Sequence, residues 1–166
     1  ILATIWPVPH VGGVSSHMLF LRDLLGRKGV AATIVTPSDA VAPGAAAAPD
    51  EGLPRTLKEL GSRLGLYLNL VWGDGQPLIH AHDVAACWGI LRAVVGAPVV
   101  LTVHGYLADE YVAVGAVAAG TAAYDALLEL ERLSYARATE VVTVDGRLAE
   151  HVRRLSGREP QVILNA

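Results

Sequence analysis

The segment from Pro7 to His17 holds the residues of this chain that are best suited to ligand chemistry. In it, Gly12 and Gly13 separate an apolar run, Ile1 to Trp6, from a stretch with helical apolar spacing, Met18 to Lys28. Adjacent glycines at this point let backbone N–H groups approach a ligand without interference from a Cβ atom. The helix adds the positive end of its dipole, so the turn can hold a phosphate or a sugar hydroxyl. A tight turn that needs glycine for its geometry alone is the alternative.

Two well-known glycine motifs do not fit this turn. The dinucleotide fingerprint requires G-x-G-x-x-G, whereas Gly12 and Gly13 are adjacent and no third glycine follows at the required spacing. No Gly-Lys-Ser/Thr follows either, so the turn is not a P-loop. Both absences argue against a dehydrogenase or a nucleoside triphosphatase. We expect Ser15 or Ser16 to cap the helix.

Three other polar positions lie at the ends of predicted strands. His80 and His82 are two residues apart and would share one face of a strand, but no third ligand is near, so we expect no metal there. His104 ends another apolar run, where it can reach a ligand and titrate near neutrality, or simply bond a neighbouring loop. Asp145 is expected to cap the helix that begins at Gly146.

The remaining polar residues suggest structural roles. The chain has no G-x-S-x-G, so a Ser-His-Asp triad has no support. The single cysteine, Cys87, lies in an apolar stretch and is expected to be an inert core residue. Because the sequence has one cysteine, a disulfide framework is excluded, which favours a cytoplasmic setting. Glu129, Glu131 and Arg132 are expected on a solvated helix face.

Composition narrows the class of protein and its partners. The chain has 166 residues, of which 52% are hydrophobic and 17% charged, enough apolar residues for one folded domain. A net charge of −3 without a Lys/Arg cluster argues against nucleic acid as a partner. Val84 to Val103 is apolar over nearly the length of a membrane span, but Arg92 and the Gly96-Ala97-Pro98 break favour a buried helix, a turn and a buried strand. No transmembrane segment is expected, and peripheral membrane contact stays open.

Continuous apolar runs alternate with helical stretches, which predicts an α/β fold with a doubly wound, Rossmann-like parallel sheet. We expect the strand order 3-2-1-4-5-6, with Gly29 ending the first helix and a loop from Pro37 to Gly52. The expected strands are Leu2–Trp6, Ala31–Thr36, Leu78–His82, Val99–Val103, Glu140–Val144 and Gln161–Leu164. The expected helices are Ser16–Lys28, Leu53–Val71, Asp83–Val95, one long helix within Tyr106–Ala136, and Gly146–Leu155.

Several short motifs occur in a characteristic order along nearly the whole chain. They are Pro9-His10-Val11-Gly12-Gly13-Val14, Arg27-Lys28-Gly29-Val30, Ala32-Thr33-Ile34-Val35-Thr36-Pro37, Ile79-His80-Ala81-His82-Asp83, Pro98-Val99-Val100-Leu101-Thr102-Val103-His104-Gly105, Glu131-Arg132, Ala138-Thr139-Glu140-Val141-Val142-Thr143-Val144 and Val162-Ile163-Leu164-Asn165. The ordered series resembles the N-terminal half of a retaining GT-B glycosyltransferase of the family-four type. The family usually has Asn-Gly where this chain has Asn165-Ala166, and a serine where Asp145 stands.

The resemblance implies two Rossmann-like domains that bind different substrates. Residues 1–166 would form the domain that mainly holds the acceptor, and the domain that mainly holds the nucleotide-sugar donor is not in this sequence. Alone, residues 1–166 would then have no turnover and bind the donor weakly. The family uses no cofactor besides its donor substrate, and retention of configuration is thought to need no protein nucleophile.

The resemblance also suggests roles for individual residues. Gly12 and Gly13 would bring backbone amides to the donor phosphates or the transferred sugar, and His104 would be the catalytic side chain that faces the reacting sugar. The candidates for acceptor binding are His10, His17, His82 and Tyr106.

Two other functions stay open at this point. One is a nucleotide-sugar epimerase of GT-B architecture, which would use acid–base side chains in the cleft. The other is a non-catalytic Rossmann-like module that binds a nucleotide or a protein. The sequence identifies neither the donor nor the acceptor, which could be a lipid, a sugar, an inositol or a small-thiol precursor.

Overall fold

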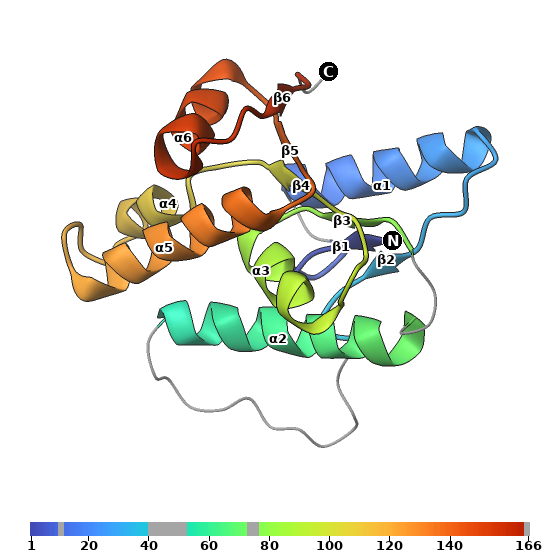
Figure 1. Ribbon diagram of the computed structural model, residues 1–166, viewed down its shortest axis with the longest axis horizontal. Coiled ribbons are helices and arrows are strands. Elements are labelled where there is room, and N and C mark those ends of the chain that lie inside the picture. The colour runs from blue at the N-terminus through green and yellow to red at the C-terminus, as the bar shows by residue number, and fades with distance from the viewer. Residues whose placement is uncertain (10–11, 40–52, 73–76, 165–166) are drawn as a thin grey trace.

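A parallel six-stranded sheet with helices on both faces forms the framework of the chain (Figure 1). The computed structural model describes residues 1–9, 12–39, 53–72 and 77–164. The strands are β1 (Leu2–Ala3), β2 (Ile34–Val35), β3 (Ile79–Ala81), β4 (Val99–Val103), β5 (Glu140–Thr143) and β6 (Gln161–Val162). The helices are α1 (Gly13–Arg27), α2 (Leu53–Trp72), α3 (Val84–Ala93), α4 (Leu107–Ala113), α5 (Ala122–Arg137) and α6 (Gly146–Ser156). The α/β fold class predicted from the sequence is confirmed.

The strand order is β2-β1-β3-β4-β5-β6, so the predicted order 3-2-1-4-5-6 is wrong. β3 lies between β1 and β4, because the His80 N–H donates to the Ile1 carbonyl and the Ile79 N–H donates to the Pro98 carbonyl. A right-handed crossover from β2 can place the third strand outside β2 or beyond β1, and hydrophobic patterns do not distinguish these outcomes. From β1 the chain first adds a strand on one side, β2, and then crosses to the other side to add β3. The carboxyl ends of β1 and β3 are therefore the topological switch point of the sheet.

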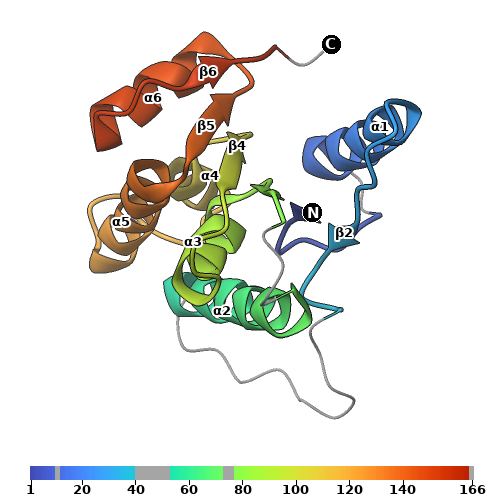
Figure 2. The ribbon, with the colours of Figure 1, turned by 45° about the vertical axis from the view of Figure 1, so that its right-hand side comes forward.

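The two faces of the sheet are covered unequally. α2, α3, α5 and α6 pack successively against one another on one face, over core residues that include Leu64, Ile90, Leu101 and Leu127. In Figures 1 and 2, α1 stands apart from this layer. The β1–α1–β2 unit runs in the opposite direction across the sheet, which places α1 on the other face. That face is therefore covered less completely.

α2 and α3 approach each other closely through glycines. A methyl group on Gly61 would collide with the Ala85 carbonyl, and one on Gly89 would collide with the Gly61 backbone. The same holds for Gly65 against the Gly89 carbonyl. Since α2 carries the chain from β2 across β1 to β3, this contact packs the crossover against the helix that follows β3.

Several predicted boundaries change. α1 begins at Gly13, so Ser15 and Ser16 lie inside the helix rather than at its N-cap. The expected long helix is two helices, because Gly115 and Gly120 adopt positive φ angles of 74° and 72° between α4 and α5. Thr121 then caps α5 by accepting a hydrogen bond from the Tyr124 N–H.

Other local predictions are confirmed. Gly29 follows the end of α1 with a φ of 76°, and the Asp145 carboxylate accepts from the first N–H groups of α6. The apolar stretch from Val84 to Val103 forms α3, a turn and β4.

None of the helices in the described ranges is long and apolar enough to cross a membrane. Most of the predicted loop from Pro37 to Gly52 lies outside the described residues.

We predict that Gly61→Ala destabilises the protein by about 1–3 kcal/mol, because the added methyl group forces two backbones apart. Gly26→Ala is the matched control: this helical glycine of α1 has open space around its Cα, so alanine there should be neutral or stabilise slightly. Urea unfolding of both variants measures the difference. Equal stability of the two variants would show that the α2–α3 contact is looser than the structure has it.

Candidate functional site

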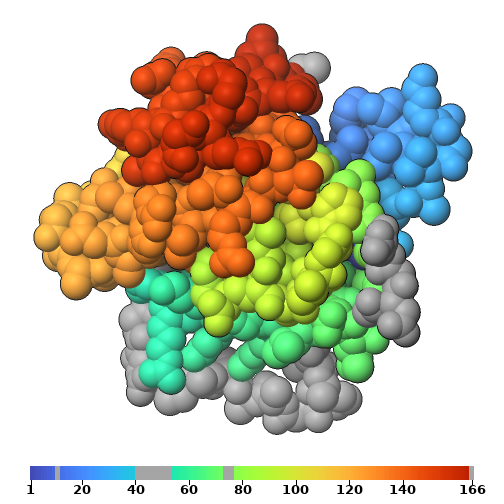
Figure 3. Space-filling model, viewed as in Figure 1, coloured from blue at the N-terminus to red at the C-terminus, as the bar shows by residue number. Residues whose placement is uncertain are grey.

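A cavity of about 420 Å³ lies where the carboxyl ends of β3 and β4 meet the start of α1. Figures 1 and 2 show α1 and α4 on either side of β4, and Figure 3 shows the surface hollowed between α1 and the C-terminal elements. The lining residues are Trp6 after β1, Gly13 and Val14 of α1, His82 and Asp83 between β3 and α3, Val84 of α3, Thr102 to Gly105 at the end of β4, and Leu107, Glu110, Tyr111 and Val114 on or after α4. Open α/β sheets bind their ligands at this position.

The start of α1 contributes backbone rather than side chains to this cavity. Gly12 is the N-cap residue, and its position has no side-chain cap. The first turn contains no acidic residue, so the positive end of the helix dipole is not neutralised locally. Apart from its chain neighbours, a methyl group on Gly13 would meet no atom of the described residues within 4 Å, so this glycine leaves open space beside the cavity.

Four histidines from three elements gather behind and within the cavity wall. The ring of His82 lies 4.2 Å from that of His80, 5.7 Å from that of His104 and 5.4 Å from that of His17, measured between centroids. The rings of His17 and His104 are 5.1 Å apart. Thr102 Oγ1 lies 2.6 Å from His80 Nε2, and His104 Nε2 lies 3.4 Å from His82 Nδ1.

Burial favours neutral imidazoles for His80, His82 and His104 at pH 7. Burial, with a smaller contribution from His17, lowers the pKa of His80 and of His104 to about 4. Burial and the neighbouring histidines lower the pKa of His82 further. Within the described part of the chain, His82 Nε2 is buried without a hydrogen-bond partner, and no group of three or more potential ligands is arranged to hold a metal ion.

Asp83 connects the ends of β1 and β3. Its carboxylate accepts from the Ala86 N–H at 2.7 Å, which caps α3, and from the Ile5 N–H and the Thr4 hydroxyl at 2.8 Å each. Burial raises the pKa of Asp83 and these hydrogen bonds oppose the rise. Because both oxygens are occupied, this side chain positions the strand ends.

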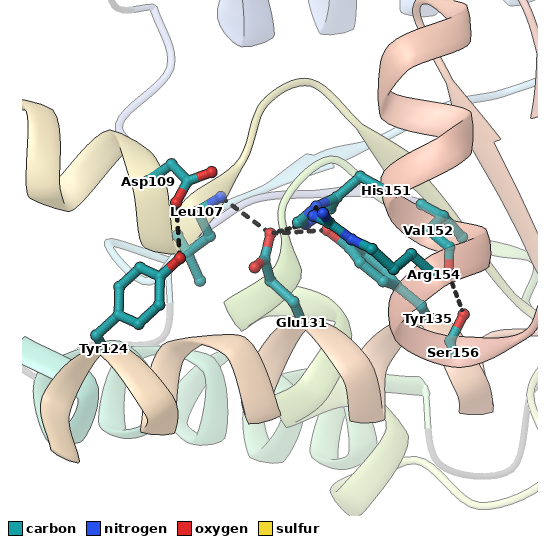
Figure 4. Close-up of polar contacts among 9 residues, drawn as sticks. All are labelled: Leu107, Asp109, Tyr124, Glu131, Tyr135, His151, Val152, Arg154 and Ser156. Carbon is teal, nitrogen blue, oxygen red and sulfur yellow. Dashed lines mark hydrogen bonds and ion pairs between the residues drawn. The ribbon is translucent and has the colours of Figure 1, made fainter. Parts of the chain in front are cut away.

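A second buried carboxylate holds the segment that follows His104 (Figure 4). Glu131 is fully buried, so the expectation of a solvated face is wrong for this residue; Glu129 and Arg132 do form an exposed ion pair. Glu131 Oε1 accepts from the Leu107 N–H at 3.0 Å and from the Tyr135 hydroxyl at 2.9 Å.

Glu131 also links this segment to α6. Arg154 donates to His151 Nδ1 at 3.1 Å, so the ring proton belongs on Nε2, which lies 3.2 Å from Glu131 Oε1 and donates to it. Glu131 therefore satisfies the first N–H of α4 and anchors the backbone between His104 and Glu110.

The candidates predicted from the sequence are distributed unevenly. Gly13, His82 and His104 line the cavity, and the His17 ring lies against the His104 ring. Tyr106 turns to α6, with its ring 4.9 Å from that of His151. His10 lies outside the described residues.

Sequence reasoning missed Trp6, Glu110 and Tyr111 as lining residues. Both Glu110 and Tyr111 lie on α4, which begins three residues after His104, and this closeness in sequence to His104 is the signal that could have found them. The buried Cys87 is confirmed as core, with burial raising the pKa of its thiol.

An open parallel sheet with a glycine turn, a helix N-terminus and a histidine around one cavity defines a Rossmann-like ligand-binding domain. Residues 11–166 match the family model described as Glycosyltransferase Family 4. The chain therefore belongs to glycosyltransferase family 4, as the N-terminal domain of the GT-B fold. A search of curated proteins finds no match.

The neutral histidines predict a loss of stability on acidification from pH 7 to 5. Folded His80 and His104 resist protonation down to about pH 4, whereas their unfolded counterparts bind protons below about pH 6.5. Protons therefore favour the unfolded state, by up to about 1.4 kcal/mol per pH unit for each histidine. Urea unfolding at pH 7, 6 and 5 measures the slope, and His80→Gln should reduce it. An unchanged slope in that variant would contradict the assigned direction.

Proposed function

We propose that this chain is the acceptor-side domain of a retaining glycosyltransferase that moves a sugar from a nucleotide-sugar to an acceptor bound in the cavity. The observation that carries the proposal is that Gly13, at the N-terminus of α1, and His104, at the end of β4, line one cavity. Membership of the glycosyltransferase family favours transfer over a purely structural binding module. The use of a nucleotide-sugar as the donor and the retention of configuration are both parts of this proposal.

On the donor side, Gly12 and Gly13 supply backbone N–H groups and the α1 dipole to the donor phosphates or the transferred sugar. His104 is neutral at pH 7 and can accept or donate one hydrogen bond to a sugar hydroxyl. Hydrogen bonds that strengthen as charge develops on the sugar would lower the barrier to transfer.

At the reacting carbon, the acceptor hydroxyl bonds to the anomeric carbon while the bond to the leaving phosphate breaks. The hydroxyl proton passes to that phosphate. Asp83 is unsuited to act as a nucleophile here, because donors from Thr4, Ile5 and Ala86 occupy its carboxylate.

We further propose that a second Rossmann-like domain supplies most donor contacts, so that residues 1–166 alone lack turnover. We also propose a cytoplasmic site of action.

In the full-length gene product, we predict that His104→Ala lowers kcat and kcat/KM together by about 10² or more, because its contact forms mainly in the transition state. Gly13→Ala should lower turnover by placing a methyl group where the ligand approaches, and it should leave stability unchanged because no atom of the described residues beyond its chain neighbours lies within 4 Å. Nucleotide release from a panel of nucleotide-sugars measures both variants, and Gly26→Ala is the matched glycine control. Near-normal turnover of a folded His104→Ala variant would remove His104 from the site.

A further inference from the structure

No lysine or arginine side chain lines the cavity. All thirteen lysines and arginines of the chain belong to the described residues, and none of them lines the cavity. Its histidines are held neutral at pH 7 by burial. The side chains around the ligand therefore offer no partner for a phosphate or carboxylate on the acceptor, since such groups are usually bound by arginine or lysine.

Among the residues that the structure describes, two carboxylates, Asp83 and Glu110, line the same cavity, and one of these two is available to a ligand. Asp83 is occupied by three protein donors. Glu110, on α4, has no hydrogen bond or ion pair to any described residue. Incomplete solvation and the nearby Glu131 raise the pKa of Glu110, as expected for a carboxylate without a compensating cation.

Gly105 determines where this carboxylate lies. A side chain at position 105 would collide with the Glu110 carboxylate, so the glycine allows Glu110 to rest against the backbone directly after His104. Glu131 fixes the same turn from the other side through the Leu107 N–H. The free carboxylate and the proposed catalytic histidine thus lie at the two ends of one short segment that Glu131 anchors at Leu107.

The rest of the wall suits the ring of a sugar-like molecule. Trp6 is 41% exposed, and Tyr111 and the exposed Val114 line the cavity with it. Aromatic and aliphatic surfaces with a few placed polar groups are typical of small-molecule sites. An ammonium beside such a ring would form a charge-assisted hydrogen bond with Glu110, about twice as strong as a neutral one.

We propose that the acceptor is an amino sugar or a similar polyol that bears a protonated amine and no anionic group, with its ammonium bound by Glu110. The proposal rests on the proposed glycosyltransferase function and names its acceptor class. The amine keeps its proton and is a recognition group; a hydroxyl of the same molecule receives the sugar in the step described above.

The test compares glucosamine, glucose and glucose 6-phosphate as probes of the full-length gene product at pH 7. Binding is followed through the Gly105 amide signal in NMR titrations, because this residue contacts Glu110. We expect glucosamine to bind about tenfold more tightly than glucose, and glucose 6-phosphate more weakly than either. Glu110→Gln should abolish the preference for glucosamine, whereas Asp125→Asn, an exposed carboxylate on α5 outside the cavity, should keep it.

Three outcomes would overturn the proposal: tighter binding of glucose 6-phosphate than of glucosamine, an unchanged preference in Glu110→Gln, or no Gly105 shift with any of the probes. These outcomes are separable from failure of the proposed function. Nucleotide release that depends on His104, combined with a preference for glucose 6-phosphate, would leave a glycosyltransferase with a different acceptor. The expected sugar preference without any consumption of nucleotide-sugar would leave a sugar-binding domain.

Discussion

The pairing of β3 between β1 and β4 is the constraint on which the site depends. It brings the turn after β1, the histidines of β3 and His104 after β4 to one edge of the sheet. Asp83 strengthens this arrangement by joining the end of β1 to the start of α3. The close α2–α3 contact holds the crossover that places β3 there. The shape of the cavity thus rests on backbone pairing and on the buried hydrogen bonds of Asp83.

The electrostatic character of the cavity follows from the same packing. Burial keeps His82 and His104 neutral, the α1 N-terminus supplies partial positive charge on one wall, and Glu110 supplies a carboxylate on the α4 wall. Such a division suits a reaction between an anionic donor and an acceptor without anionic groups. Glu131 keeps the α4 wall in place through the Leu107 N–H, so a fully buried side chain outside the cavity influences what the cavity can bind.

Sequence patterns predicted the elements better than their arrangement. β4 matches its prediction because Pro98 and His104 bound one apolar run, and Asp145 caps α6 because that role is local. The strand order depends on a long-range crossover that local patterns do not encode. Glu131 was misassigned on its charge, although it follows Leu127 and Leu130 in the buried stripe of α5. Glu110 lines the cavity from α4, and the hydrophobic pattern of that helix does not indicate this position.

The most direct measurement is NMR of the full-length gene product with labelled histidine rings and glycine amides, during titration with UDP-glucose, UDP-N-acetylglucosamine and GDP-mannose. If nucleotide-sugar binds where the α1 N-terminus meets β4, at least one of these should shift the His104 ring and the Gly13 amide together. His151, buried between α5 and α6, should not respond. Shifts confined to His151, or no change at His104 with all three donors, would contradict the account.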